Sequence, residues 1–402
     1  MTAILHVLRS QAPRASMAEA PRAWCGLVLG MLAAAGLVAC QSPAPPAPSA
    51  ATASAAEAPA SSEAAASPEA AAVAVPAAAS PGPSGTVRVL SADAAVLQRP
   101  TTAAFRGQDL WIAIGQLSVL FGSDGAKPAL PFAALSLPLA GGALGAQKIA
   151  LPGPDYYPEG TAAAADGTLY IGSIMQGRIV KVPAGSTEAL SFVSKPTVKR
   201  GVIGLTVDAE RQLLWFCDSN PKLEDAKKAG ELVGVQLAGA KEVVRHALPP
   251  AEGKAPFCND VIVSPDGALW VTDSAVGRVF RVPAEQALQP NSAAVWAAGD
   301  EVRPPVSGVG SGANGLDWIE GKLVVANVGR GTLVQLDPNS PDPGRGAQLI
   351  ALTDPQTQAP ASLCSPDGVE RVPGSKDKLV VVENGGCPAK LPRIIEVTLS
   401  PR

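Results

Sequence analysis

A pattern that recurs six times after residue 100 most narrows the folds open to this chain. Each copy contains a short motif, an apolar strand, a turn, and a leucine followed by an aromatic residue or valine. The six leucines are Leu110, Leu169, Leu214, Leu269, Leu323 and Leu379. Repeats of about fifty residues have room for about four strands each, which is the size of a propeller blade, and six blades close a ring. We therefore predict an all-β fold, a six-bladed β-propeller, over residues 86–402.

The two ends of the repeat region indicate how the ring closes. The last repeat offers three strands, "GVERV", "KLVVVEN" and "RIIEVTL", and the segment "GTVRVLSA" at 85–92 precedes the first repeat. We expect this N-terminal segment to form the outer strand of the last blade, because it would then cover an otherwise open sheet edge.

The first 85 residues have a different composition and a different predicted role. Arg14 and Arg22 precede the apolar run "AWCGLVLGMLAAAGLVA", and this order is typical of an export signal. The run ends in "LVAC", which resembles the bacterial lipoprotein signal, so we expect residues 1–39 to be removed and Cys40 to carry lipid. A plain signal or an uncleaved membrane anchor is the alternative. Residues 40–85, rich in Ala, Pro and Ser, are expected to be a disordered tether.

The predicted export sets the expected location and partners. We expect a protein of the cell envelope that is lipid-anchored to a membrane and faces the periplasm or the exterior. A formal net charge of −3 argues against nucleic acid as a partner, and we expect a monomer.

The letters "SPDG" occur twice, at 264–267 and 365–368, in two different places of the repeat. Asp266 lies between the first and second strands of its repeat, where Pro-Asp-Gly is turn chemistry. Asp367 instead begins the innermost strand of the last repeat. The counterparts of Asp367 in the other five repeats are Thr101, Glu159, Ile203, Asn259 and Asn314.

Because the innermost strands of a propeller line its channel, these six residues should form one ring at one mouth. Glu159, Asn259, Asn314 and Asp367 offer two carboxylates and two amide oxygens, a set that suits Ca²⁺. Another divalent metal is possible, but the ring contains no His or Cys that would favour zinc. The alternative is that these residues only begin strands beside glycine.

A second set of polar residues ends the second strand of four repeats. Its members are Asp218, Asp273, Asn327 and Glu383. Adjacent strands are antiparallel, so these residues should return to the same mouth. There they would either contact substrate or support the metal ligands, or they would be solvated strand ends.

Four cysteines remain after export, an even number compatible with disulfides. Cys217 and Cys258 are expected at the ring-side mouth of neighbouring blades, and Cys364 and Cys387 on either side of two strands of the last repeat. We therefore expect the pairs Cys217–Cys258 and Cys364–Cys387. Four free buried thiols are the alternative.

The motifs "PEG", "ND", "NGLDW" and "PDG" resemble the family of gluconolactonase, senescence marker protein and luciferin-regenerating enzyme over residues 86–402. The resemblance implies a six-bladed propeller with one divalent metal on Glu159, Asn259, Asn314 and Asp367. It also implies lactone hydrolysis in which Asp367 acts as base and the metal as Lewis acid. Strictosidine synthases and paraoxonases share this architecture, so the fold alone does not determine the chemistry.

Two features bear on the substrate and the mechanism. Sugar-lactone members of that family have an arginine at the place of Phe257, so an apolar residue here favours a more hydrophobic small-molecule lactone or ester. His246 is the only histidine after the signal, and it lies in the outer-strand segment "VVRHAL", where we expect it on the surface. A Ser-His-Asp triad or a His-dyad mechanism therefore has no plausible members. Two functions remain open: a metal-dependent hydrolase of a lactone or ester, and a non-catalytic calcium-stabilised binding or scaffold lipoprotein.

Overall fold

The computed structural model describes residues 82–122, 125–221, 229–251, 253–305, 311–387 and 391–401. They belong to one compact unit, residues 76–402. The expected signal peptide, Cys40 and all but the last four residues of the expected tether lie outside the described residues. Within the described ranges, no helix has both the length and the apolar character needed to cross a membrane.

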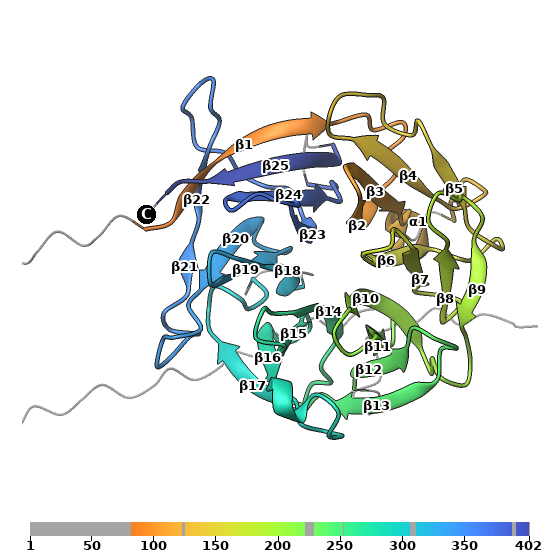
Figure 1. The fold of residues 1–402 in the computed structure, drawn as a ribbon. Coiled ribbons are helices and arrows are strands. Elements are labelled where there is room, and N and C mark those ends of the chain that lie inside the picture. The colour runs from red at the N-terminus through yellow and green to blue at the C-terminus, as the bar shows by residue number, and fades with distance from the viewer. Residues whose placement is uncertain are drawn as a thin grey trace, which may run out of the picture. The chain divides into compact units, whose positions relative to one another are not determined.

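Six sheets are arranged in a ring around a central channel (Figure 1), which confirms the predicted six-bladed β-propeller. Five sheets have four strands each, in chain order from the channel outward. The first two contain β2 (Pro100–Arg106), β3 (Asp109–Ile114), β4 (Ala133–Pro138) and β5 (Lys148–Ala150), then β6 (Pro158–Ala163), β7 (Leu169–Ser173), β8 (Arg178–Val182) and β9 (Leu190–Val193).

The next three blades follow the same order. The third contains β10 (Gly201–Asp208), β11 (Leu213–Ser219), β12 (Glu231–Gln236) and β13 (Glu242–Ala247). The fourth contains β14 (Cys258–Val263), β15 (Leu269–Asp273), β16 (Arg278–Val282) and β17 (Ala294–Ala298). The fifth contains β18 (Ala313–Ile319), β19 (Lys322–Asn327), β20 (Thr332–Leu336) and β21 (Gln348–Leu349). The described residues add the short helices α1 (Leu117–Phe121) and η1 (Ala284–Gln286).

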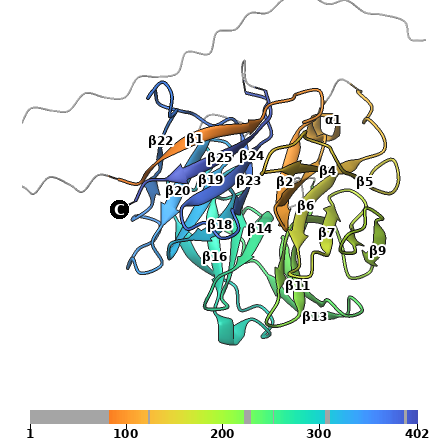
Figure 2. The same ribbon diagram turned by 45° about the horizontal axis from the view of Figure 1, so that its top comes forward.

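The last blade is built from both ends of the repeat region. Its strands are β23 (Pro366–Arg371), β24 (Lys378–Glu383), β25 (Arg393–Leu399), β1 (Ser84–Ser91) and β22 (Ala351–Thr353). β1 pairs antiparallel with β25 from Gly85 opposite Leu399 onward, so the N-terminal segment closes the ring as expected. Figure 2 shows β1 lying along β25. The short β22 adds a fifth strand, parallel to β1, that the repeat pattern does not predict.

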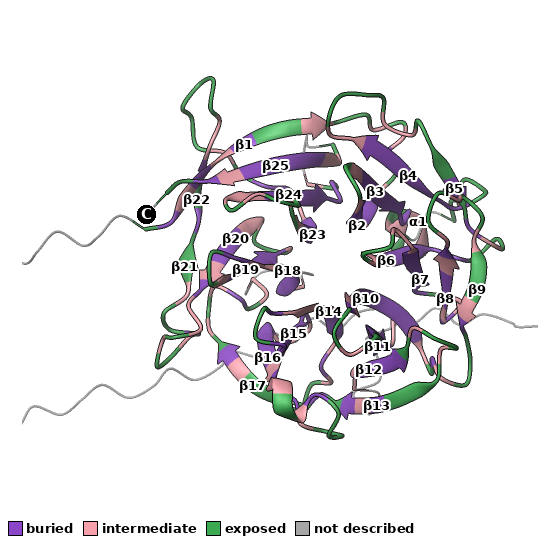
Figure 3. Ribbon diagram, viewed as in Figure 1, coloured by how far each residue is buried: buried purple, intermediate pink, exposed green. Residues whose placement is uncertain are grey.

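The leucine of each repeat explains how the blades pack. All six anchoring leucines have no exposed surface, because each lies on a second strand that has a neighbouring blade on both faces. Figure 3 shows the inner and middle strands largely buried, with exposure concentrated on outer strands and loops. Burying one leucine side chain contributes about 2 kcal/mol, so the recurrent leucine stabilises every blade.

Each of the six innermost strands carries a β-bulge at the same level. The register against the second strand shifts between Pro100 and Ala103 in β2, and at the matching place in the other five. Side chains of a regular strand alternate between its two faces. Because each bulge inserts one residue, the ring residue and the residue three positions after it lie on the same face of the strand. The bulges therefore decide what lines the channel.

Glycine follows the ring position in four blades because neighbouring innermost strands approach each other closely. A Cβ atom at Gly160 would overlap the carbonyl oxygen of Ile203, and one at Gly315 would overlap that of Asp367. Neither position has room for a side chain, so these glycines allow a narrow ring.

Candidate metal centre

The four predicted ligands lie at one level of the ring. Glu159, Asn259, Asn314 and Asp367 are each the second residue of their innermost strand, in β6, β14, β18 and β23. Their side chains are nearly enclosed, with exposed fractions of 4%, 7%, 6% and 3%. The register expected from the sequence therefore brings all four to the same depth of the channel.

The two carboxylates of the ring differ in their hydrogen bonds. The Oδ2 atom of Asp367 accepts a hydrogen bond of 2.7 Å from Nδ2 of Asn384, and the side chain of Asn314 also bonds to this carboxylate. The Oε2 atom of Glu159 is buried, and no donor from the described residues reaches it. A buried carboxylate oxygen without a partner is costly, so Glu159 has unused capacity to bind a ligand.

The pKa values of both ring carboxylates are raised. Burial raises the pKa of Glu159 well above its usual range, and the carboxylates of Asp367 and Asp260 raise it further. Burial raises the pKa of Asp367 to about 7, opposed by its bonds from Asn384 and Asn314. Among the described residues, the interactions that shift these two pKa values involve no lysine or arginine.

This donor set fits a hard divalent cation. Carboxylate and amide oxygens are the ligands that Ca²⁺ prefers, and the unpartnered Oε2 of Glu159 is the oxygen that a cation would satisfy. Within the described ranges, no three His, Cys, Asp or Glu side chains cluster as metal ligands. A cation at this level would therefore depend on the amide oxygens of Asn259 and Asn314 as well.

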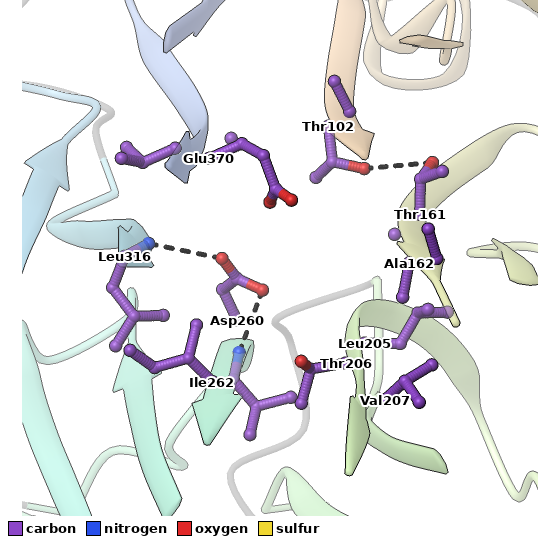
Figure 4. A pocket seen from close by; sticks show the side chains of 16 residues that line it. Thr102, Thr161, Ala162, Leu205, Thr206, Val207, Asp260, Ile262, Leu316 and Glu370 are labelled. Carbon is purple, nitrogen blue, oxygen red and sulfur yellow. Dashed lines mark hydrogen bonds between the residues drawn. The ribbon is translucent and has the colours of Figure 1, made fainter. Parts of the chain in front are cut away.

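Further along the innermost strands than the ring lies a cavity of about 100 Å³, whose carboxylates the sequence patterns do not assign to a site. Figure 4 shows Asp260 and Glu370 pointing into it. Asp260 accepts hydrogen bonds from the backbone nitrogens of Val261, at 2.9 Å, and Leu316, at 3.3 Å. Burial is the main cause that raises the pKa of Asp260 to about 7 and that of Glu370 well above its usual range. The nearby Asp317 does not line the cavity, and burial raises its pKa to about 6.

The β-bulges explain why the sequence analysis missed two of these residues, Asp317 and Glu370. Asp317 and Glu370 lie three residues after Asn314 and Asp367, the spacing that one inserted residue places on the channel face. Asp260 occupies the position after the ring, where four other blades have glycine. The sequence shows the residues but not the bulges.

Asn384, also missed from the sequence, lies directly after β24 and is 7% exposed. Its Nδ2 atom is 2.7 Å from Oδ2 of Asp367 and 2.7 Å from the carbonyl oxygen of Pro100. No sequence motif marks this asparagine, because its two partners lie on different blades.

The second set of polar residues supports the segments that lead into the innermost strands. Asp218, Asp273, Asn327 and Glu383 have no exposed surface, so they are not solvated strand ends. Asp218 accepts from the backbone nitrogens of Lys199 and Arg200, both at 2.9 Å, just before β10.

The other three members also hydrogen-bond to backbone groups of the segments before the innermost strands. Oδ1 of Asp273 accepts from the nitrogen of Phe257 at 2.9 Å, Nδ2 of Asn327 donates to the carbonyl of Arg303 at 2.9 Å, and Glu383 accepts from the nitrogen of Cys364. Phe257 itself is half-buried and packs against the core. These protein contacts use the polar groups of all four residues, and contact with a substrate stays a prediction for them and for Phe257.

Two disulfides brace the same mouth. The structure joins Cys217 to Cys258 and Cys364 to Cys387, with Cα atoms 5.2 Å and 5.7 Å apart. These are the pairs expected from the sequence. The first links β11 to the start of β14 in the next blade, so it fixes the residue that precedes Asn259.

His246 does not lie on the surface, and that expectation is wrong. The side chain has no exposed surface because residues 284–292 cover the outermost strand β13. Its Nε2 atom donates to the carbonyl of Ala287 at 2.9 Å, and Nδ1 accepts from the backbone nitrogen of Ser292 at 3.2 Å. Burial lowers the pKa of His246. Both contacts hold the covering segment against β13, so the role of the imidazole is structural.

Comparison with known proteins bears mainly on the fold. The family described as "Strictosidine synthase-like, N-terminal" matches residues 144–182, too short a stretch to establish the family. No curated protein matches the chain.

Three solved structures are similar to the chain over 78–79% of its length. A luciferin-regenerating enzyme has a TM-score of 0.55 at 14% identity, with 95% of its own chain covered. Regucalcin from Agrobacterium tumefaciens, described as a calcium-binding protein, has 0.54 at 17% identity and 95% coverage. A gluconolactonase from Xanthomonas campestris has 0.51 at 14% identity and 90% coverage. At these identities the likeness concerns the six-bladed propeller fold alone.

Proposed function

We propose that this protein is a metal-dependent hydrolase of a lactone or ester. The observation that carries the proposal is the buried ring of Glu159, Asn259, Asn314 and Asp367, in which one Glu159 oxygen has no partner among the described residues. The fold shared with a gluconolactonase and a calcium-binding regucalcin supports a lactone as the substrate class and calcium as the metal.

In this proposal each ring residue has a defined task. The two carboxylates and two amide oxygens of the ring would hold Ca²⁺, which when bound supplies a Lewis acid for the ester carbonyl. Asp367 would accept a proton from the attacking water. Asn314, which bonds to Asp367, would help to hold its carboxylate in place. Phe257 beside Asn259 would favour an apolar substituent on the substrate.

A second function is favoured by the depth of the ring. Exposed fractions of 3–7% leave little of the ring accessible to a substrate. A calcium-stabilised binding or scaffold protein would need only the buried cation.

The decisive experiment is a hydrolysis screen of the purified protein with short, long and aromatic lactones and with aryl esters, in 1 mM Ca²⁺ and in EDTA. Asp367→Asn keeps an oxygen ligand but cannot take a proton from water near neutral pH, so kcat should fall by about 10²- to 10⁴-fold. Asp266→Asn is the matched control, because the same four-letter motif there forms an exposed turn.

Each result separates the two functions. Absence of calcium-dependent hydrolysis across the screen would favour the binding protein. Hydrolysis that survives Asp367→Asn would leave the metal centre in place but remove Asp367 as the base.

The proposed location is a lipid anchor at Cys40 that holds the propeller at a membrane, facing the periplasm or the exterior. Cys40→Ser should release the protein into the soluble fraction with its unfolding midpoint unchanged. Retention of this variant in membranes would point to an uncleaved helix at 23–39 instead.

A further inference from the structure

We propose that Asn384 is a positioning residue, which fixes the carboxylate of Asp367 and ties it to the junction between the last and first blades. The inference rests on the metal centre of the proposed function and adds a residue to it that touches neither metal nor substrate.

One amide group makes both contacts. The Nδ2 atom of Asn384 carries two hydrogens, and its two acceptors, Oδ2 of Asp367 and the carbonyl oxygen of Pro100, both lie at 2.7 Å. Asp367 belongs to β23 and Pro100 to β2, so the group spans the junction where the ring closes. A hydrogen bond to an ionised carboxylate is about twice as strong as one between neutral groups.

The equivalent positions in two other blades separate the two tasks. Ser219 is the last residue of β11 in the third blade, and Ser274 directly follows β15 in the fourth. Their hydroxyls donate to the carbonyls of Cys258, at 2.8 Å, and Ala313, at 2.6 Å. Each carbonyl immediately precedes the ring residue of the next blade, as Pro100 precedes Thr101.

A serine therefore suffices for the contact between blades. It has a single hydrogen to donate, so it cannot also bond to a carboxylate on its own blade. The second N–H of Asn384 is the part that the blade contact does not explain, and it points at Asp367. An amide nitrogen cannot accept a proton or a metal ion, so the role of this group is to orient Oδ2 of Asp367.

The serines also supply the variant that tests the inference. Asn384→Ser keeps a hydroxyl for Pro100, as in the third and fourth blades, and removes the donor to Asp367. Ser136→Ala is the control, because it removes a buried hydroxyl that bonds to the backbone of Gln147 in the first blade, away from the ring. Calcium affinity is measured by isothermal titration calorimetry of the whole protein, and the unfolding midpoint is measured in EDTA.

Asn384→Ser should bind Ca²⁺ about 10- to 100-fold more weakly than the wild type, the usual loss when a hydrogen bond to a metal ligand is removed. Its midpoint in EDTA should stay at or above that of Ser136→Ala, whose calcium affinity should be unchanged. In an Asp367→Asn background, Asn384→Ser should lower the affinity by a smaller factor than in the wild type, because a hydrogen bond to an uncharged amide oxygen is weaker than one to a carboxylate.

Calcium affinity equal to that of the wild type in a folded Asn384→Ser protein would overturn the positioning role while leaving the metal centre intact. If the serine variant does not fold, Asn384→Thr presents the same single hydroxyl and is held to the same outcomes. A wild-type protein that binds no Ca²⁺ would overturn the metal centre and this inference together.

Discussion

We expect Glu159→Gln to stabilise the protein without calcium and to destabilise it, relative to the wild type, when calcium is present. In EDTA, the wild type keeps the Glu159 carboxyl in a buried site near the carboxylates of Asp367 and Asp260, with Oε2 unpartnered. Glutamine has nearly the same shape and no charge, so the variant should unfold at a higher temperature than the wild type. In Ca²⁺ the carboxylate becomes a ligand that glutamine replaces poorly, so the wild type should be the more stable of the two.

The size of the calcium effect follows from mass action. A ligand at 100 times its Kd stabilises the folded state by about 2.7 kcal/mol. A domain of roughly 300 residues unfolds with an entropy of about 0.6 kcal/mol/K near its midpoint, from about 2.1 cal/mol/K per residue. The wild-type midpoint should therefore rise by about 4 °C, and that of Glu159→Gln by less than about 1 °C.

Differential scanning calorimetry in EDTA and in 1 mM Ca²⁺ measures both midpoints. Glu188→Gln, an exposed change between β8 and β9, is the control for loss of one negative charge. Equal wild-type midpoints in the two buffers would refute the metal centre. A calcium shift that Glu159→Gln retains in full would mean that calcium binds elsewhere on the protein.

Three further predictions concern the framework around the ring. Acidification below about pH 6.5 should destabilise the wild type more than His246→Gln, because burial lowers the pKa of His246 and the unfolded chain takes up the proton first; urea unfolding near pH 5 and pH 7.5 measures this, and equal pH dependences would contradict it. Gly315→Ala should cost up to about 3 kcal/mol because its Cβ overlaps the carbonyl oxygen of Asp367; a stability equal to that of the wild type in the same urea titration would argue against the close approach of these strands. Replacing Cys217 and Cys258 together by serine should cost about 4 kcal/mol, since the disulfide closes a loop with a sequence separation of 41, and unchanged denaturant unfolding under non-reducing conditions would speak for free thiols.

The fold and the common level of the four ring residues could be predicted because both depend on a repeated spacing. Six leucines in matching places specify six blades, and the register counted back from them brings Glu159, Asn259, Asn314 and Asp367 to one level. A one-residue error in that register would have moved these side chains to the other face of their strands.

The cavity further along the innermost strands could not be predicted in the same way. The bulge in each innermost strand changes the alternation of side chains, and an inserted residue leaves no mark in the apolar pattern. Asp317 and Glu370 therefore resemble ordinary polar residues of half-exposed strands. β22 was missed for a similar reason, because three residues are too short for an alternating pattern.

Contacts between distant segments account for the other differences. The bond from Asn384 to Pro100 joins residues 284 positions apart, and neither local sequence suggests the other. His246 is buried by residues 284–292 of another blade. A polar outer strand gives no sign that a later segment will cover it.

The pairing of β1 with β25 sets an order of events during synthesis. β1 is among the first parts of the propeller to leave the ribosome and β25 comes last among its described strands, so β1 waits without its antiparallel partner until all six blades have been translated. Asp367 and Asn384 arrive with that same final blade, and Asn384 reaches Pro100 only when the ring closes. A nascent chain of five blades thus has an open edge and lacks one of the four ring residues, and both are completed in one late step.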